Sequence, residues 1–324
     1  MTFFNLMELE NQTQVTEFIF LGFSSLPHGQ AFLFPVFLMI YITTIVGNSM
    51  IFTLIQLDSH LHSPMYFFLS HLSCLDICFS SVTVPKILVN FLHERETISY
   101  SECMAQMFLL MSCAGAECAL LTIMAYDRYA AICNPLRYTD IMSRRVCFPL
   151  AVGSWLWGLL DSAIHTFLAS KLSFCGANQL HHIFCDVPPL LKIACSDTYT
   201  NEMVLHAASV FVGLSPFLLI VISYLYILAA ILRIRSNSGR RKAFSTCAAH
   251  LSVVTIYFGM ANLNYNRPGT GYSTGVDTLV STLYCIVTPM LNPLIYSLRN
   301  QEVKRAMRKA LGSQTREYTS PCRQ

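Results

Sequence analysis

The chain has 324 residues, of which 54% are hydrophobic and only 12% are charged. Soluble domains carry roughly 25% charged residues, and the mean hydropathy of +0.49 is high. The net charge of +3 is small and dispersed, and no Gly-rich phosphate loop is present, which argues against nucleic acid as a partner. The composition therefore predicts an integral membrane protein.

Seven apolar segments are long enough to cross a membrane, because a bilayer core of about 30 Å needs roughly 20 apolar helical residues. Four carry no charge, and the other three carry a single acid each, namely Asp76, Glu117 and Asp161. The alternating pattern of a membrane barrel is absent, so we expect helices. In chain order the segments are Phe18–Leu57, Ser63–Pro85, Cys103–Tyr126, Val146–Ser170, Met203–Leu232, Ala243–Asn266 and Thr278–Leu298.

The basic residues predict the orientation of these spans. On the amino-terminal side only Arg95, Lys171, Lys192 and Arg267 are basic, whereas most other lysines and arginines lie on the opposite side. Cytosolic loops carry an excess of such residues, so we expect an extracellular amino terminus and a cytoplasmic carboxyl terminus. No basic n-region precedes the first span, which is expected to serve as its own insertion signal.

The resulting organisation has an outer tail, seven spans and an inner tail. Asn11-Gln12-Thr13 is a glycosylation acceptor on the luminal side of this topology. Val303, Ala306 and Met307 alternate with basic residues, so the segment after the last span is predicted to be an amphipathic helix on the anionic inner leaflet. The expected boundaries are 1–29 (tail), 30–57, 63–88, 101–129, 145–168, 202–232, 242–264 and 276–298 (spans), 169–201 (second extracellular loop), 300–311 (amphipathic helix) and 312–324 (cytoplasmic tail).

Six short strings lie in a recognisable order along the spans. They are Gly47-Asn48, LHSPMYFFL at Leu61–Leu69, MAYDRY at Met124–Tyr129, Ser223-Tyr224, KAFSTC at Lys242–Cys247 and PMLNPLIY at Pro289–Tyr296. Together they resemble the rhodopsin-like G-protein-coupled receptors, specifically the olfactory (odorant) receptors of the tetrapod class. The resemblance covers the chain from about Asn11 to Leu311. Where the family usually has Phe-Tyr-Gly, this chain has Tyr257-Phe258-Gly259, which removes a hydroxyl from a position that often faces the ligand.

The resemblance implies an all-α membrane protein, a seven-transmembrane helix bundle with a short amphipathic C-terminal helix. It implies a receptor of the plasma membrane and not an enzyme. A small volatile odorant would bind within the bundle and activate a stimulatory, olfactory-type heterotrimeric G protein, which raises cAMP. Membrane lipids are the other expected partners. A transporter would show internal repeats, and none is visible. An intramembrane acid hydrolase is disfavoured by the strings around Asp76 and Glu117.

Arg128 is the central residue of the predicted G-protein switch. By resemblance it pairs with a neighbouring carboxylate in one state and faces an opened cytosolic crevice in another, with tyrosines moving toward it. The alternative is an arginine that only sets topology. The switch set implied by the resemblance is Asp127, Arg128, Tyr129, Tyr224, Asn292, Pro293 and Tyr296.

Asp76 and Glu117 are acids in the membrane interior, where a carboxylate usually pairs, protonates or holds an ion. By family geometry Asn48, Ser73 and Asn292 are their neighbours. We interpret the acid pair as a sodium or proton site. The open alternative is a water-filled structural network, and no other cofactor is expected.

Four cysteines face the oxidising side of the membrane, and four cysteines allow three connectivities. They are Cys103, Cys175, Cys185 and Cys195. The superfamily resemblance favours Cys103–Cys185 with Cys175–Cys195, and Cys103–Cys195 is the alternative.

The expected ligand cavity is apolar with a few neutral polar groups, which favours an alcohol, aldehyde, ketone or ester oriented by Asn262 or Tyr265. Asp161 and His165 share one face of the fourth span and either pair with each other or line this cavity. The candidate lining is Met107, Met111, Gly115, Ser209, Val212, Phe258, Asn262, Tyr265 and Thr282.

Overall fold

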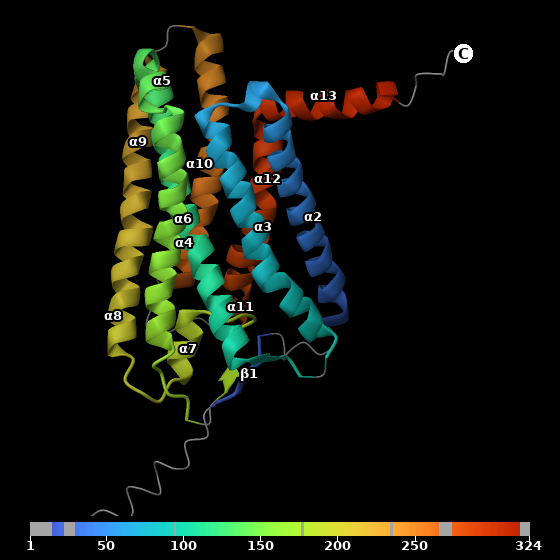
Figure 1. Cartoon of the computed structure of the whole chain (residues 1–324), viewed down its shortest axis with the longest axis vertical. Helices are drawn as coiled ribbons and strands as arrows, with labels where there is room; N and C mark the ends of the chain where they lie inside the picture. Colours follow the sequence, from blue (N-terminus) through green and yellow to red (C-terminus); the bar gives the residue numbers. More distant parts are fainter. Residues whose placement is uncertain are drawn as a thin grey trace, which may run out of the picture.

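The computed structural model describes residues 15–22, 30–93, 95–175, 178–233, 236–265 and 274–317. Long helices lie side by side along one axis, and the last helix lies across one end of the bundle (Figure 1). The long helices are α2 (Gln30–Leu57), α3 (Pro64–Phe91), α4 (Tyr100–Cys133), α6 (Arg144–Ala169), α8 (Tyr199–Ala208) continued by η3 (Ser209–Leu214) and α9 (Ser215–Leu232), α10 (Asn237–Tyr265), α11 (Thr274–Thr282) continued by η4 (Leu283–Val287) and α12 (Thr288–Arg299), and α13 (Gln301–Glu317).

Six helices in the described part of the chain are long and apolar enough to cross a membrane. α10 is equally long but more polar, and it packs within the bundle against α4, α9 and α12. The prediction of an all-α membrane protein with a seven-helix bundle is therefore confirmed. The six apolar spans are Ala31–Leu57, Pro64–Phe91, Tyr100–Cys133, Arg144–Ala169, Tyr199–Leu232 and Thr278–Ser297.

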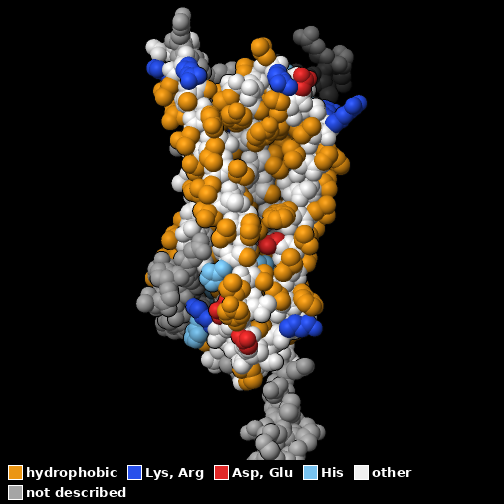
Figure 2. Space-filling view, turned by 90° about the vertical axis from the view of Figure 1, so that its left-hand side faces the viewer, with side chains coloured by type: hydrophobic (Ala, Val, Ile, Leu, Met, Phe, Trp, Pro, Cys, Tyr) orange, Lys and Arg blue, Asp and Glu red, His pale blue; other side chains and the backbone are white. Residues whose placement is uncertain are grey.

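The outer surface of the bundle is apolar along its middle. Figure 2 shows hydrophobic side chains over this region, with most charged side chains gathered near the two ends. Phe148, Leu218 and Leu225, for example, are exposed on the long helices. In water such a surface would be unfavourable, but in lipid it needs no cover. The surface therefore fits a protein that spans a bilayer.

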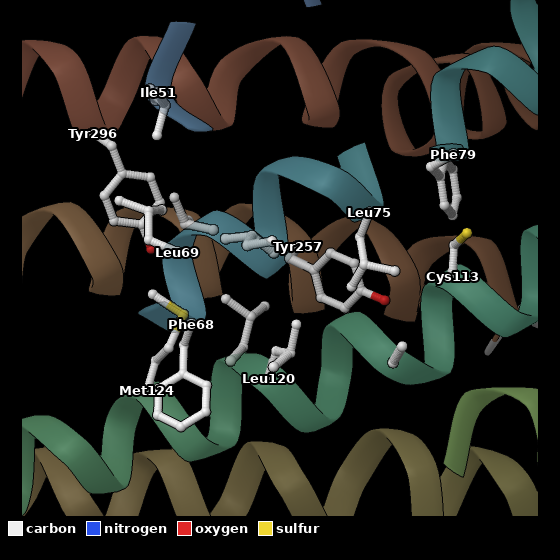
Figure 3. Packing of buried hydrophobic residues seen from close by; sticks show 14 of the residues in the cluster. Ile51, Phe68, Leu69, Leu75, Phe79, Cys113, Leu120, Met124, Tyr257 and Tyr296 are labelled. Carbon is white, nitrogen blue, oxygen red and sulfur yellow. The ribbon is translucent and has the colours of Figure 1, made fainter. Parts of the chain in front are cut away.

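The interior is packed by side chains from helices α2, α3, α4, α6, α9, α10, α12 and α13. Leu75 of α3, Leu120 of α4 and Tyr257 of α10 point toward one another in the centre of this cluster (Figure 3). Phe79 of α3 and Cys113 of α4 continue the packing along the bundle. The cluster holds the helices that carry the polar residues described below.

Helices α4 and α6 approach each other through small residues. A Cβ atom on Gly115 would lie 3.0 Å from the Cα atom of Gly158, and one on Gly158 would lie 2.7 Å from the backbone nitrogen of Ala116. Small residues allow helix backbones to come this close in a membrane. Ser162 adds a hydrogen bond of 2.5 Å from its hydroxyl to the carbonyl oxygen of Phe108.

Two helices contain a π-helical turn just ahead of a proline. η3 precedes Pro216, and η4 precedes Pro289. Proline has no N–H to donate and its ring crowds the carbonyl four residues back, so the chain widens locally. After η4, the Thr288 hydroxyl donates a 3.0 Å hydrogen bond to the Leu283 carbonyl, which also accepts the backbone N–H of Thr288.

One end of the bundle carries a small sheet. Its strands are β1 (Glu17–Phe20), β2 (Thr97–Ser99) and β3 (Gln179–Leu180), in the order β2-β1-β3. β1 pairs antiparallel with β2 and parallel with β3, so it joins the loop after α3 to the loop after α6. A short helix, α7 (Val187–Ile193), completes this end.

The opposite end carries the short elements η1 (Ser59–Leu61), η2 (Pro135–Arg137) and α5 (Tyr138–Ile141). Here α13 begins directly after α12 and extends beyond the expected end at 311 to Glu317. Its buried side chains Val303 and Ala306 join the main core, and the hydroxyl of Tyr66 donates a 2.7 Å hydrogen bond to Glu302. The apolar face of the predicted amphipathic helix is thus partly covered by the bundle itself.

Candidate functional site

The two intramembrane acids meet in the middle of the bundle. The Nδ2 atom of Asn292 lies 2.9 and 3.1 Å from the two carboxylate oxygens of Asp76 and 3.4 Å from Oε1 of Glu117. All three side chains are buried. Asn48 is not part of this contact, because it donates to the carbonyl oxygens of Thr44 and Pro289 and so ties α2 to α12. One amide therefore holds two acids from α3 and α4 in the membrane interior.

A second polar group lies at the end of α4 that faces the arginine-rich loops. The hydroxyl of Tyr138 donates a 2.7 Å hydrogen bond to Oδ1 of Asp127. Three buried polar atoms have no hydrogen-bond partner within the described residues, namely Oδ2 of Asp127, Nε of Arg128 and the hydroxyl of Tyr296. Buried polar groups are almost always paired, so this cluster is poised to form other contacts.

Tyr224 and His250 bring α9 and α10 together beside this cluster. The Tyr224 hydroxyl lies 2.7 Å from Nδ1 of His250, and the two rings are stacked with centroids 5.8 Å apart. His250 is fully buried, and its ring also interacts with the backbone of Leu121 in α4. The sequence interpretation missed His250, although a histidine inside an otherwise charge-free span was a visible signal.

The outer end of the bundle is fastened by disulfides. Cys103 at the start of α4 is bonded to Cys185, and Cys175 is bonded to Cys195 within the loop between α6 and α8. The alternative pairing of Cys103 with Cys195 is not formed. Met107 and Met111 lie in the adjoining hydrophobic cluster, together with Cys103 and Cys185.

A chain of buried polar residues ties the same loop to α10 and α11. Nε2 of His182 lies 2.7 Å from the Ser281 hydroxyl, which donates a 2.8 Å hydrogen bond to Oδ1 of Asn264. Asn264 in turn donates to Asp186 at 3.5 Å, and Tyr265 also hydrogen-bonds Asp186. The loop therefore closes over the bundle through specific contacts, none of which the sequence interpretation identified.

The Tyr257 hydroxyl occupies the centre of the bundle. It donates a 2.8 Å hydrogen bond to the carbonyl oxygen of Ala114 and lies 3.3 Å from the Tyr284 hydroxyl. It also accepts from the Cys118 thiol at 3.5 Å. The departure from the usual family string therefore moves a hydroxyl to a position where it joins α10, α4 and η4.

Two members of the expected ligand cavity are not where the sequence interpretation put them. Asn262 has an exposed side chain, whereas Asn264, on another face of α10, is fully buried. Gly115 faces Gly158 of α6 and fills the helix contact described above. Helical spacing alone does not fix which face of a helix points inward, so the sequence did not anticipate the surroundings of these two residues.

The remaining cavity candidates lie in the outer half of the bundle. Met107, Met111 and Phe258 are buried, and Val212 packs against the main core. The hydroxyls of Ser209 and Thr282 donate to carbonyl oxygens of their own helices, at 3.0 and 2.7 Å.

Asp161 and His165 lie close to each other on α6. Oδ1 of Asp161 is 3.9 Å from Nε2 of His165, whose side chain is almost completely buried.

Among the described residues no group of three or more His, Cys, Asp or Glu side chains is arranged to hold a metal ion. The predicted glycosylation acceptor Asn11 lies outside the described residues.

A membrane bundle of seven helices, with an acid–amide cluster at its centre and an Asp-Arg-Tyr string at one end, defines a rhodopsin-like G-protein-coupled receptor. The family profile described as "Olfactory receptor" matches residues 37–314. Olfactory receptor 5AP2 of Mus musculus is 53% identical over 302 residues, covering 93% of this chain and 95% of that protein. Olfactory receptor 2A1/2A42 of Homo sapiens is 50% identical, covering 94% of this chain and 99% of that protein.

The chain therefore belongs to the olfactory receptor family. It is a multi-pass membrane receptor and not an enzyme, as the sequence resemblance implied. Odorants and G proteins are the partners of such receptors in general.

Proposed function

We propose that this receptor binds a small, neutral volatile odorant and activates a stimulatory, olfactory-type G protein that raises cAMP. The observation that carries the proposal is the buried cluster at the inner end of α4. There Asp127, Arg128 and Tyr296 have polar atoms without partners among the described residues. A partner helix that enters between the helices supplies such atoms with new contacts. The receptor needs only a shift between two arrangements, not chemistry of its own.

The chemistry of the outer cavity supports a neutral ligand. An amine ligand would favour an acid beside the ligand on the outer half of α4, where this chain has Leu110, Met111 and Ala114. Glu117 lies about 21 Å along the helix from Cys103 at 1.5 Å per residue, too deep for a ligand held beneath the outer loop. Asp161 lies 3.9 Å from His165 on α6, and Asp186 of the outer loop accepts a hydrogen bond from Asn264. Tyr265 remains as an orienting group, while Asn262 is withdrawn from that role.

We place the receptor in the plasma membrane with its amino terminus outside and its carboxyl terminus in the cytoplasm. The asymmetry of lysine and arginine supports this orientation. The two disulfides lie at the end of the bundle that would then face the oxidising compartment. In the same topology Asn11 is available for glycosylation, and α13 meets the lipids of the inner leaflet.

We also propose that Asp76 and Glu117 share a sodium ion or a proton. Their carboxylates both contact the Asn292 amide, so two like charges lie within a few ångström of each other. Two carboxylates this close do not both ionise without a counter-ion. If sodium is the counter-ion, Asp76→Asn removes the dependence of the basal signal on sodium concentration. An unchanged sodium response in that variant leaves the structural network as the function of the pair.

The experiment that tests the receptor function is a cAMP measurement on cells expressing Arg128→Ala, with surface expression measured in parallel. Loss of the odorant response at normal surface expression is expected. Arg95→Ala is the matched control, because Arg95 is an exposed arginine at the other end of the bundle. Normal signalling by Arg128→Ala would overturn the assignment of Arg128 to the switch.

A further inference from the structure

A cavity of about 360 Å³ lies at the same end of the bundle as the arginine-rich loops. It is formed where α2 ends, where α3 begins and where α6 begins. Neither the polar cluster around Arg128 nor the expected odorant cavity contributes a lining residue. The cavity is therefore a separate feature of the fold.

The walls of the cavity are largely apolar. Ile55, Leu61 and Met142 are buried side chains that line it, and the partly buried Phe67 lines it as well. Phe148, which also lines the cavity, is 65% exposed on the outer surface of α6. The cavity consequently reaches the surface that the bilayer covers. An apolar space open to hydrocarbon suits an acyl chain.

The polar part of the cavity is positive. The exposed side chain of Arg144 lines it, and His62 and Ser63, just before the start of α3, line its other polar wall. No acidic residue is among the described residues that line it. Asp58, the nearby acid in the preceding loop, is engaged by His60 and Lys309. An arginine at the rim, next to an apolar interior, matches an anionic headgroup attached to a hydrocarbon chain.

We propose that this cavity binds an anionic diacyl phospholipid of the cytosolic leaflet. One acyl chain lies between Ile55, Leu61 and Met142, and the phosphate lies beside Arg144. The inference uses the orientation proposed above, since anionic lipids are concentrated in the cytosolic leaflet. It is independent of which odorant or G protein the receptor uses.

The test is native mass spectrometry of the full-length receptor in detergent, titrated with phosphatidylserine or phosphatidylcholine. Wild type is expected to bind the first phosphatidylserine more tightly than the first phosphatidylcholine. Arg144→Gln should weaken phosphatidylserine binding about fivefold, the equivalent of about 1 kcal/mol per basic residue, and leave phosphatidylcholine unchanged. Arg145→Gln is the matched control, because it removes the same charge from an exposed neighbour that does not line the cavity.

A second variant tests the acyl chain. Ser70 lines the cavity and its hydroxyl bonds only within its own helix, to the Phe67 carbonyl at 2.7 Å. Ser70→Leu fills the space and should weaken the binding of both lipids. Equal losses in Arg144→Gln and Arg145→Gln would overturn the proposal in favour of unspecific surface charge. Binding of glycerophosphoserine equal to that of the lipid, or tight cholesterol binding that is insensitive to Arg144→Gln, would also overturn it.

Discussion

The hydroxyl of Tyr138 in α5 donates a 2.7 Å hydrogen bond to Oδ1 of Asp127 in α4. The acid of the Asp-Arg-Tyr string is thus held by the loop that follows α4. Arg128 is left with a buried Nε that has no hydrogen-bond partner in the described part of the chain. This bond keeps the neighbouring carboxylate from competing for the arginine, so it favours the arrangement in which Arg128 is available to a partner.

Tyr138→Phe is expected to weaken signalling. Without the hydroxyl, the Asp127 carboxylate is left to recruit Arg128. Loss of one hydrogen bond costs about 0.5–1.5 kcal/mol, so the odorant concentration for half-maximal cAMP should rise about twofold to twelvefold. Tyr126→Phe is the control, since Tyr126 is an exposed tyrosine on α4, the helix that carries Asp127. An unchanged dose–response in Tyr138→Phe would show that this bond has no part in coupling.

The Tyr138 hydroxyl should not titrate near neutral pH. Burial, with the Asp127 charge adding to it, raises the pKa of Tyr138 above its ordinary value, which is about 10. Because folding raises this pKa, the stabilisation of the fold by the Tyr138–Asp127 hydrogen bond is complete below pH of about 10. It is lost only above that pH. Thermal unfolding of the wild type and Tyr138→Phe should therefore differ by the same amount at pH of about 7 and about 9. A difference that shrinks between these values would contradict the assigned protonation.

Gly158→Val is expected to destabilise the receptor. A side chain there meets the backbone of α4 at Ala116, which cannot move away without separating the helices. Overpacking of this kind costs about 1–3 kcal/mol, so the melting temperature of the purified receptor should fall. Gly153→Val is the matched control on the same helix, where nothing lies within 4 Å of an added Cβ. Equal melting temperatures for the two variants would refute the close contact.

The two disulfides are expected to differ in importance. Cys103–Cys185 closes a separation of 82 residues and Cys175–Cys195 one of 20. A disulfide that closes a longer loop removes more chain entropy from the unfolded state, so Cys103–Cys185 should stabilise the fold by about 1 kcal/mol more than Cys175–Cys195. Cys103→Ser should therefore reduce surface delivery more than Cys175→Ser, and the double variant Cys103→Ser, Cys185→Ser should be no worse than either single one. A double variant clearly worse than both singles would contradict the pairing.

Much of the fold was predictable because it depends on properties that are local in the sequence. Apolar length predicts spans, and lipid leaves a helical bundle as the arrangement that satisfies the backbone. The contact of Asp76 with Asn292 followed from the family geometry. Tyr138 and His250 were not identified, because their importance depends on partners on other elements, Asp127 and Tyr224, that no local pattern reveals.

The rotation of a helix about its own axis was the other property that the sequence did not determine. Phe258, Asn262 and Tyr265 share one face of α10 by helical spacing, and Tyr257 and Asn264 share another. Both faces contain aromatic and amide groups, so the hydrophobic pattern does not distinguish them. The Tyr257 hydroxyl fixes one of these faces against α4 and η4, which buries Asn264 and leaves Asn262 exposed, while Phe258 on the face of Asn262 is also buried.

The amides of Asn264 and Asn262 offer the sharpest comparison. Asn264 accepts from Ser281 and donates to Asp186, so Asn264→Leu leaves two buried groups without this partner. Each such loss costs about 1–3 kcal/mol, and the outer loop should loosen over the bundle. We expect a lower melting temperature and a weaker response to every odorant tested, whatever its functional group. The exposed Asn262 should tolerate Asn262→Leu with little change in either measurement.

Ser281→Ala provides an intermediate step, because it removes the hydroxyl that joins His182 to Asn264 while leaving the helix surface nearly unchanged. Its response should fall between those of the wild type and Asn264→Leu. The measurements are the melting temperature of the purified receptor and cAMP dose–responses to a ketone, an alcohol and a hydrocarbon. If Asn262→Leu instead weakens the cAMP responses to the ketone and the alcohol and spares the response to the hydrocarbon, Asn262 faces the ligand.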